Sequence, residues 1–263
     1  MKQVEQYWEV MKQELDQTEL VLRKNNTVIQ NYKAIFNWSG GKDSSLCLFY
    51  ALKDERFDIQ YLLTTLNGKY KRVSMHGLSE YLLDDQVKSI GLPLHKIYLP
   101  EFPTMEEYER LISKELTEAK NQDITISIFG DIFLEDLREY RENQLMKKRF
   151  TAIFPLWKRD TKEIAMEFIE LGFKAIIVSI DSRYLDKSFV GRIYDKSFLN
   201  DLPQNIDPCG ENGEFHSFVF DGPIFKNPIS FIKGKVVYKE YKSNNNKEKP
   251  EENIGFWYCD LKI

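Results

Sequence analysis

The six consecutive residues Ser39 to Ser44 carry the groups that proteins use to hold a phosphate chain. The two serine hydroxyls can donate hydrogen bonds, and Lys42 adds a positive charge. Asp43 could help to hold the Mg²⁺ that accompanies a nucleotide. Two glycines between these side chains let the backbone turn sharply and approach an anion closely. The run therefore predicts a phosphate-binding loop.

The elements around this loop favour the same chemistry. An apolar, strand-like segment at residues 34–38 precedes Gly40 and Gly41, and a helix-compatible segment at 43–53 follows them. The N–H groups of the first helical turn would point at a bound anion, helped by the helix dipole. Two other glycine-rich motifs do not fit. A Walker A loop needs a glycine where this chain has Phe36, and a dinucleotide-binding fingerprint needs a third glycine.

Composition bounds the class of protein. The chain has 263 residues, of which 42% are hydrophobic and 14% aromatic, which is enough for one large or two small domains with a real core. The net charge of −4 argues against a general nucleic-acid binder, so we expect no stable nucleic-acid partner. Three scattered cysteines form neither a disulfide framework nor a zinc ribbon. Without an apolar run of about 18 residues or an apolar leader, we expect a cytoplasmic protein with no membrane contact.

The hydrophobic pattern predicts an α/β fold from residue 33 onward, because short apolar strands alternate with amphipathic helices. The expected strands of this part are 33–38, 59–66, 94–99 and 124–129, and the expected helices are 43–53, 77–90 and 105–120. Such an order is typical of a doubly wound, mostly parallel Rossmann-like sheet that is covered on both faces.

The rest of the chain is expected to form smaller units. An amphipathic helix is expected at 3–24, helices at 135–149 and 161–171, a buried strand at 174–180, antiparallel strands at 215–220 and 230–240, an exposed loop at 242–252 and an edge strand at 255–263. We therefore predict four segments: an N-terminal helical extension at 1–31, an ATP-binding domain at 32–135, a smaller substrate domain of α+β type at 136–226 and a C-terminal β-hairpin extension at 227–263.

Candidate binding residues follow the expected strands, since ligands of doubly wound sheets lie at the carboxyl ends of the strands. Thr65 ends the second strand and could receive an adenine edge or be a plain strand end. His76 opens a helix and could bind a ligand or only cap the helix. Gly130 and Asp131 end the fourth strand, where Asp131 could orient a substrate or bind a metal. Arg138 could neutralise a phosphate or belong to a surface ion pair.

The segment from Asp207 to Phe218 is an unusual cluster of glycines, carboxylates and a histidine at the entry of an apolar strand. A hairpin turn explains its Asn-Gly pair but not Glu214 and His216, which stand two residues apart and would share one strand face. We predict a substrate site that also uses Glu211, Asn212 and Gly213.

In these motifs the chain resembles the diphthine–ammonia ligase family, a branch of the ATP pyrophosphatases, from about residue 33 to about 226. The resemblance rests on Ser39–Ser44, Arg72–Gly77, Gly130–Arg138, Pro155–Trp157 and Asp207–Phe218, and it ends at Asp221–Pro223. It implies an adenine nucleotide alpha-hydrolase-like domain that cleaves ATP between the α and β phosphates. A smaller family-specific domain would follow it.

The activity that the resemblance implies is amide synthesis. A carboxylate-bearing acceptor, either a protein side chain or a small molecule, would be adenylated and then attacked by ammonia. Lys42 and Mg²⁺ would neutralise phosphate charge, Asp131 would face the acceptor, and Glu214 or His216 would take the proton from ammonium. The acidic groups would suit a cationic acceptor such as diphthine.

One observation leaves other functions open. The segment before His76 differs from that of the diphthine-modifying members. The resemblance therefore implies the ATP chemistry for this chain but not diphthine as its acceptor. ATP-dependent thiolation of tRNA or a small molecule and non-catalytic nucleotide binding are the alternatives. A homodimer is also left open.

Overall fold

The computed structural model describes residues 31–73, 77–242 and 253–262. The predicted helix at 3–24, His76 and most of the predicted loop at 242–252 lie outside these residues. Ten strands and six helices make up the described part of the chain. None of these helices has the length and apolar composition needed to cross a lipid bilayer.

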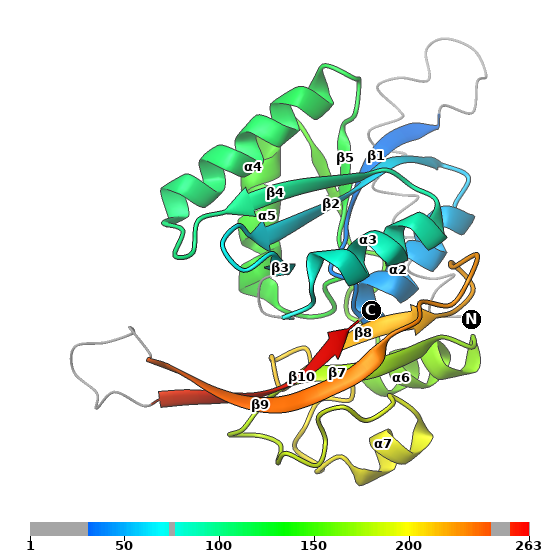
Figure 1. Ribbon diagram of the computed structural model, residues 1–263. Helices are drawn as coiled ribbons and strands as arrows, with labels where there is room; N and C mark the ends of the chain where they lie inside the picture. Colours follow the sequence, from blue (N-terminus) through cyan, green and yellow to red (C-terminus); the bar gives the residue numbers. More distant parts are fainter. Residues whose placement is uncertain (1–30, 74–76, 243–252, 263) are drawn as a thin grey trace.

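The first sheet is mostly parallel and has its switch point beside the first strand (Figure 1). Its parallel strands are β1 (Tyr32–Asn37), β2 (Phe57–Asn67), β4 (Leu94–Leu99), β5 (Ile126–Ile128) and β6 (Thr151–Ile153), in the order β4-β2-β1-β5-β6. A short strand, β3 (Arg72–Val73), pairs antiparallel with the end of β2. The chain therefore builds one half of the sheet, returns past β1 and builds the other half.

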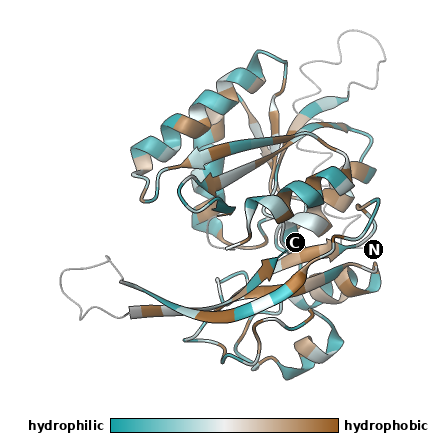
Figure 2. Cartoon of the chain, in the orientation of Figure 1, coloured by the Kyte–Doolittle hydropathy of each residue, from teal (hydrophilic) through white to brown (hydrophobic). Residues whose placement is uncertain are grey.

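Helices cover both faces of this sheet. They are α2 (Lys42–Lys53), α3 (Glu80–Ile90), α4 (Met105–Lys120) and α5 (Glu135–Met146). Because side chains alternate along a strand, Ala34 and Phe36 of β1 pack with α2 and α3, whereas Ile35 packs with α4 and α5. In Figure 2 hydrophobic residues gather on the strands, and hydrophilic residues line much of α4. This two-sided burial is the doubly wound arrangement.

A second, antiparallel sheet lies below the first (Figure 1). It contains β7 (Lys174–Asp181), β8 (Phe215–Asp221), β9 (Ile232–Lys242) and β10 (Asn253–Lys262) in the order β8-β7-β10-β9, accompanied by α6 (Thr161–Glu170) and α7 (Lys196–Asp201). Buried residues of this sheet, such as Ile177 and Phe218, belong to the same hydrophobic core as Leu46 of α2. The start of α2 is therefore packed between the two sheets.

The predicted fold class is confirmed, and most elements lie within a few residues of their expected positions. Three short elements, β3, β6 and α7, were not predicted from the sequence. The predicted helix at 77–90 begins only at Glu80, because Gly77 adopts a left-handed φ of 65° and the chain first closes a turn back to Val73. The division into four segments stays a prediction.

The prediction of an edge strand at 255–263 is wrong. β10 lies inside the second sheet and pairs with both β7 and β9, so β9 is the edge strand. The alternation of polar and apolar residues in β9 resembles that of a strand with neighbours on both sides, so the pattern does not mark β9 as the edge strand. β9 lies at the edge because β10 pairs with the distant strand β7.

A buried glutamine joins the two sheets at the phosphate-binding loop. The side-chain Nε2 of Gln86, on α3, donates to the carbonyl oxygen of Gly40 at 3.0 Å and to that of Val219, on β8, at 2.6 Å. The backbone N–H of Val219 also donates to the Gly40 carbonyl at 3.1 Å. The loop is thus held against the second sheet by a side chain that is fully buried.

We expect Gln86→Leu to lower the free energy of unfolding by about 1–3 kcal/mol, because it removes two buried hydrogen bonds. Denaturant titration measures the change. Gln60→Leu is the matched control, since Gln60 bonds only to the nearby carbonyl of Asp58 in an exposed contact, and it should cost less than about 0.5 kcal/mol. Equal stability losses in the two variants would contradict this role of Gln86.

Candidate active site

A cavity of about 570 Å³ lies between the carboxyl ends of β1, β2 and β5 and the loop that precedes β8. We call it the nucleotide cavity, after the ligand that the sequence predicts. Its walls include Ser39 and Gly41–Ser44 of the phosphate-binding loop, residues Leu63–Thr65 of β2, Phe129–Asp131 after β5 and most of Cys209–Ser217. Both sheets therefore contribute to one site, at the position where doubly wound folds bind their ligands.

The phosphate-binding loop has the geometry that its glycines predict. Gly40 adopts a left-handed φ of 79°, and Gly41 is the N-cap of α2. The hydroxyl oxygens of Ser39 and Ser44 lie 2.9 Å apart, and the N–H of Gly41 donates to the Ser39 hydroxyl at 3.2 Å. The first intrahelical bond of α2 is donated by the N–H of Ser45, and the N–H of Lys42 is taken by Ser217. The N–H groups of Asp43 and Ser44 have no acceptor inside the helix, so they are available to an anion.

Gly130 brings the end of β5 against the start of α2. A Cβ atom at Gly130 would lie 3.1 Å from Cα and 3.2 Å from the backbone nitrogen of Ser44. These are backbone atoms that cannot move without shifting the helix start. A glycine at this position therefore permits the close approach of the end of β5 to the start of α2, both of which line the cavity.

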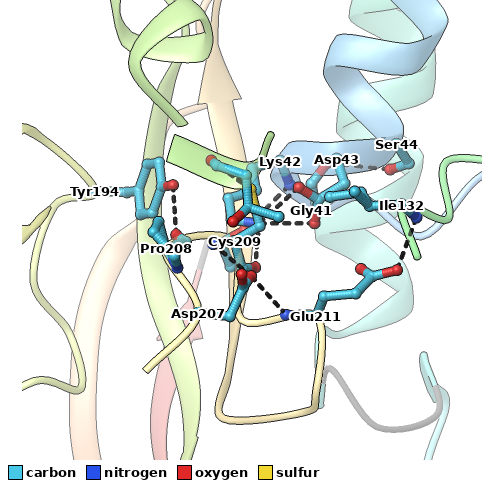
Figure 3. A network of polar contacts seen from close by, with 12 residues as sticks. Gly41, Lys42, Asp43, Ser44, Ile132, Tyr194, Asp207, Pro208, Cys209 and Glu211 are labelled. Atoms are coloured by element: carbon cyan, nitrogen blue, oxygen red, sulfur yellow. Dashed lines mark hydrogen bonds and ion pairs between the residues drawn. The ribbon is translucent and has the colours of Figure 1, made fainter. Parts of the chain in front are cut away.

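Lys42 is buried and is held by groups from two parts of the chain (Figure 3). Its Nζ lies 2.6 and 2.7 Å from the two carboxylate oxygens of Asp43, and it also donates to the carbonyl oxygen of Cys209. Burial lowers the pKa of Lys42, but the neighbouring Asp43 outweighs it, so the pKa lies above its ordinary value. The backbone N–H of Lys42 donates to the hydroxyl of Ser217, on β8, at 3.1 Å.

The loop before β8 is shaped by Asp207 (Figure 3). One carboxylate oxygen of Asp207 accepts hydrogen bonds from the backbone N–H of Cys209 at 2.9 Å and from that of Glu211 at 3.3 Å. Gly210 follows the turn with a left-handed φ of 67°, where a Cβ would lie 2.8 Å from the carbonyl oxygen of Phe215. This turn directs the Cys209 carbonyl to Lys42.

Glu211 reaches across the cavity to the first sheet. Its carboxylate accepts a hydrogen bond of 2.7 Å from the backbone N–H of Ile132, just after β5. Burial and the nearby Asp43 raise the pKa of Glu211 to about 7, while the Ile132 N–H and Lys42 oppose the shift. A carboxyl group that titrates near neutral pH can exchange protons with a ligand in the cavity.

The predicted site residues fall into four groups. Those that line the nucleotide cavity are Ser39, Gly41, Lys42, Asp43, Ser44, Thr65, Gly130, Asp131, Glu211, Asn212, Gly213 and His216. Gly40 supports the loop from behind through its contacts with α3 and β8. Glu214 and Arg138 lie outside the cavity lining. The prediction for His76 falls outside the described residues.

Glu214 is a buried support for its own loop. Its side chain is 2% exposed, and one oxygen accepts from the Asn212 amide at 3.0 Å and from the Asp207 N–H at 3.3 Å. The expectation that Glu214 and His216 share a strand face fails, because β8 begins at Phe215 and Glu214 still belongs to the loop.

Two arginines on α5 have different surroundings. Arg138 bonds to Glu142 at 2.7 Å, and its guanidinium lies 4.7 Å from the ring centre of Trp157. Arg141, one turn later, lines the nucleotide cavity and lies 3.2 Å from the carboxylate of Asp131. Arg141 was not among the candidate residues that we selected from the sequence.

Sequence reasoning also missed other lining residues, among them Asn37, Tyr108 and Ser217. Asn37 is the last residue of β1, and its strand-end position was a usable signal. Ser217 lies within an apolar strand, and its contact with the Lys42 N–H depends on how the two sheets meet.

The fold and the cavity define a doubly wound α/β protein with a polar site at the carboxyl end of its parallel sheet. Comparison with known families is more specific. A profile described as the diphthamide synthase N-terminal domain matches residues 32–147, and one described as the diphthamide synthase C-terminal domain matches residues 160–250. The chain therefore belongs to the diphthamide synthase family, which confirms the family predicted from the motifs.

Several curated relatives carry the name diphthine–ammonia ligase. The protein of Bos taurus is 28% identical over 225 residues, and that of Homo sapiens is 23% identical over 222 residues. Each alignment covers 76% of this chain and 82% of the relative. The protein of Schizosaccharomyces pombe is 27% identical over 136 residues, which span 50% of this chain and only 22% of that longer protein.

The raised pKa of Glu211 predicts a pH-dependent stability. Between its ordinary value of 4.5 and the folded value of about 7, the unfolded chain is ionised at this residue while the folded chain holds a proton. Stability is therefore lost as the pH rises through this interval. We expect Glu211→Gln to remove the loss and to gain about 1–3 kcal/mol over the original chain at pH 8, but much less at pH 5.

Denaturant unfolding at both pH values, without nucleotide or divalent cation, measures the difference. Glu139→Gln is the control, because it removes the same type of side chain from an exposed position on α5, and it should show no such pH-dependent gain. A gain for Glu211→Gln that is the same at pH 5 and pH 8 would contradict the assigned titration.

Proposed function

We propose that this chain uses ATP to activate a carboxylate and then converts it to an amide with ammonia. As a member of the diphthamide synthase family, the chain is an ATP-dependent ligase that forms a carbon–nitrogen bond. The observation that carries the proposal is the joint cavity. The start of α2 with Lys42, Asp131 from the loop after β5 and Glu211 from the loop before β8 all line this cavity.

The groups of the phosphate-binding loop suit a polyphosphate. The N–H groups at the start of α2 and the hydroxyls of Ser39 and Ser44 can donate to phosphate oxygens, and Lys42 supplies a charge beside them. Asp43 is the residue that would hold Mg²⁺, since one carboxylate together with phosphate oxygens is a usual magnesium ligand set. Bound Mg²⁺ would neutralise part of the phosphate charge.

The proposed reaction consists of two displacements. An oxygen of the acceptor carboxylate attacks the α-phosphorus, and the bond from this phosphorus to the bridging oxygen breaks, so pyrophosphate leaves. The nitrogen of ammonia then attacks the acyl carbon, the carbon–oxygen bond to AMP breaks, and the nitrogen releases one proton. His216 and Glu211 line the cavity and can accept this proton, whereas Glu214 is buried behind the loop.

The surroundings of Cys47 and Cys209 argue against the alternative of thiolation. Cys47 is fully buried and its sulfur donates to the carbonyl of Phe129, while Cys209 is 2% exposed and its sulfur donates to the carbonyl of Thr161. Burial raises the pKa of both thiols well above its ordinary value. A sulfur carrier needs an accessible thiolate, which these surroundings disfavour.

The proposal is tested by the products formed from ATP. Incubation with ATP, Mg²⁺, ammonium and a panel of carboxylic acids should yield AMP and pyrophosphate, resolved by anion-exchange chromatography. Lys42→Ala should weaken ATP binding by about tenfold or more, since it removes a charge-assisted contact worth about 1.5–3 kcal/mol. Release of ADP and orthophosphate instead would refute the proposed reaction.

Lys158→Ala is the matched control for the loss of a lysine. Lys158 is 64% exposed, and within the described residues its side chain pairs only with the exposed Glu135, so its removal should leave ATP binding unchanged. A similar loss of affinity in both variants would indicate a general electrostatic effect and not a contact in the phosphate-binding loop.

A further inference from the structure

A second cavity, of about 430 Å³, lies between α4, α5 and the face of the first sheet that these helices cover. We call it the α4–α5 chamber. Its lining contains an apolar wall of Leu63, Ile112, Leu116, Phe129, Leu137 and Leu145. Charged residues on α4 and just after α5 also line it, namely Glu106, Glu109, Arg110, Lys147 and Lys148. A volume of this order is large enough to enclose a small organic molecule.

The chamber opens onto the nucleotide cavity. Seven residues line both spaces: Asn37, Leu63, Tyr108, Ile112, Phe129, Leu137 and Arg141. Among the described lining residues, Arg141 is the only charged side chain that the two share. The junction between the chamber and the phosphate-binding region therefore carries one guanidinium, which faces the carboxylate of Asp131 on the side of the nucleotide cavity.

Arg141 has hydrogen-bonding capacity to spare at this junction. Its guanidinium stacks 4.5 Å from the ring centre of Phe129, and its contacts with Asp131 are long, at 3.2 and 3.3 Å. Its buried Nε makes no aligned hydrogen bond within the described part of the chain. Since a guanidinium offers five donors in a fork that matches a carboxylate, the group can bind a second carboxylate beside Asp131.

We propose that the α4–α5 chamber takes the apolar body of the acceptor and that Arg141 binds the acceptor's carboxylate at the junction. The acceptor would then be a small carboxylic acid with an aromatic or branched aliphatic body. This inference rests on the proposed function for the role of the acid as acceptor, but the binding of such an acid does not depend on ATP. Arg141 is a binding residue for the carboxylate, and the apolar wall selects the body.

The test uses 3-phenylpropionate and its uncharged amide, 3-phenylpropanamide, as probes in titrations followed by NMR. We expect the acid to bind the original chain without ATP, and to bind about tenfold or more tightly than the amide. Arg141→Gln should abolish the difference between acid and amide. Arg149→Gln is the matched control, because Arg149 is exposed and lines neither cavity, and it should keep the difference.

A second pair of variants tests the place of binding. Ser113, on α4, lines only the chamber, so Ser113→Trp should fill it and lose both probes while ATP binding is kept. Thr117→Trp adds the same side chain one turn later at an exposed position outside the lining, and it should keep both probes. Circular dichroism melts confirm that each variant is folded.

Three results would overturn the proposal. They are no acid binding by the original chain at millimolar concentration, unchanged acid binding by Ser113→Trp, and loss of ATP binding by the folded Ser113→Trp variant. The last result would assign the chamber to the nucleotide. Failure of the proposed function is distinguishable from these, since it would appear as no ATP binding by the original chain while the acid still binds.

Discussion

The buried charge of Lys42 is the constraint on which the rest of the site depends. An ammonium group that is only 3% exposed must find partners inside the protein, because an uncompensated charge there is costly. Asp43 supplies the opposite charge from the same helix, and the Cys209 carbonyl supplies an acceptor from the loop before β8. The second sheet therefore completes the polar surroundings of a lysine that the first sheet presents, and the two parts form one cavity.

Further contacts follow the same seam between the sheets. The N–H of Lys42 donates to Ser217, the N–H of Val219 donates to the Gly40 carbonyl, and Glu211 accepts from the Ile132 N–H. Each links the carboxyl end of a parallel strand or its loop to β8 or the segment before it. Carboxylates and a lysine are thereby held close together in a space of limited solvent access, where their pKa values shift and a phosphate chain can be oriented. Positioning and charge are what phosphoryl chemistry requires of a protein.

The sequence predicts the parts of this arrangement that depend on local pattern. The strand and helix around Ser39–Ser44 follow from hydrophobic periodicity and glycines, and the helix starting at Met105 follows from the capping box of Thr104 and Glu107, which the structure contains. The choice between Arg138 and Arg141 could not be made from the sequence. Both lie on one helix, and only the contacts with Asp131 and Trp157 distinguish the residue at the cavity from the one beside it. The buried role of Glu214 likewise depends on the turn that Asp207 forms.

The central claim is that the phosphate-binding loop and the loop before β8 bind one nucleotide together. Hydrogen exchange followed by mass spectrometry, with and without ATP and Mg²⁺, tests it without knowledge of the acceptor. The account predicts that ATP slows amide exchange both at the start of α2, in residues 40–45, and in residues 209–217, with no change in α7 (Lys196–Asp201). Slower exchange in residues 40–45 alone, or in neither segment, would contradict it.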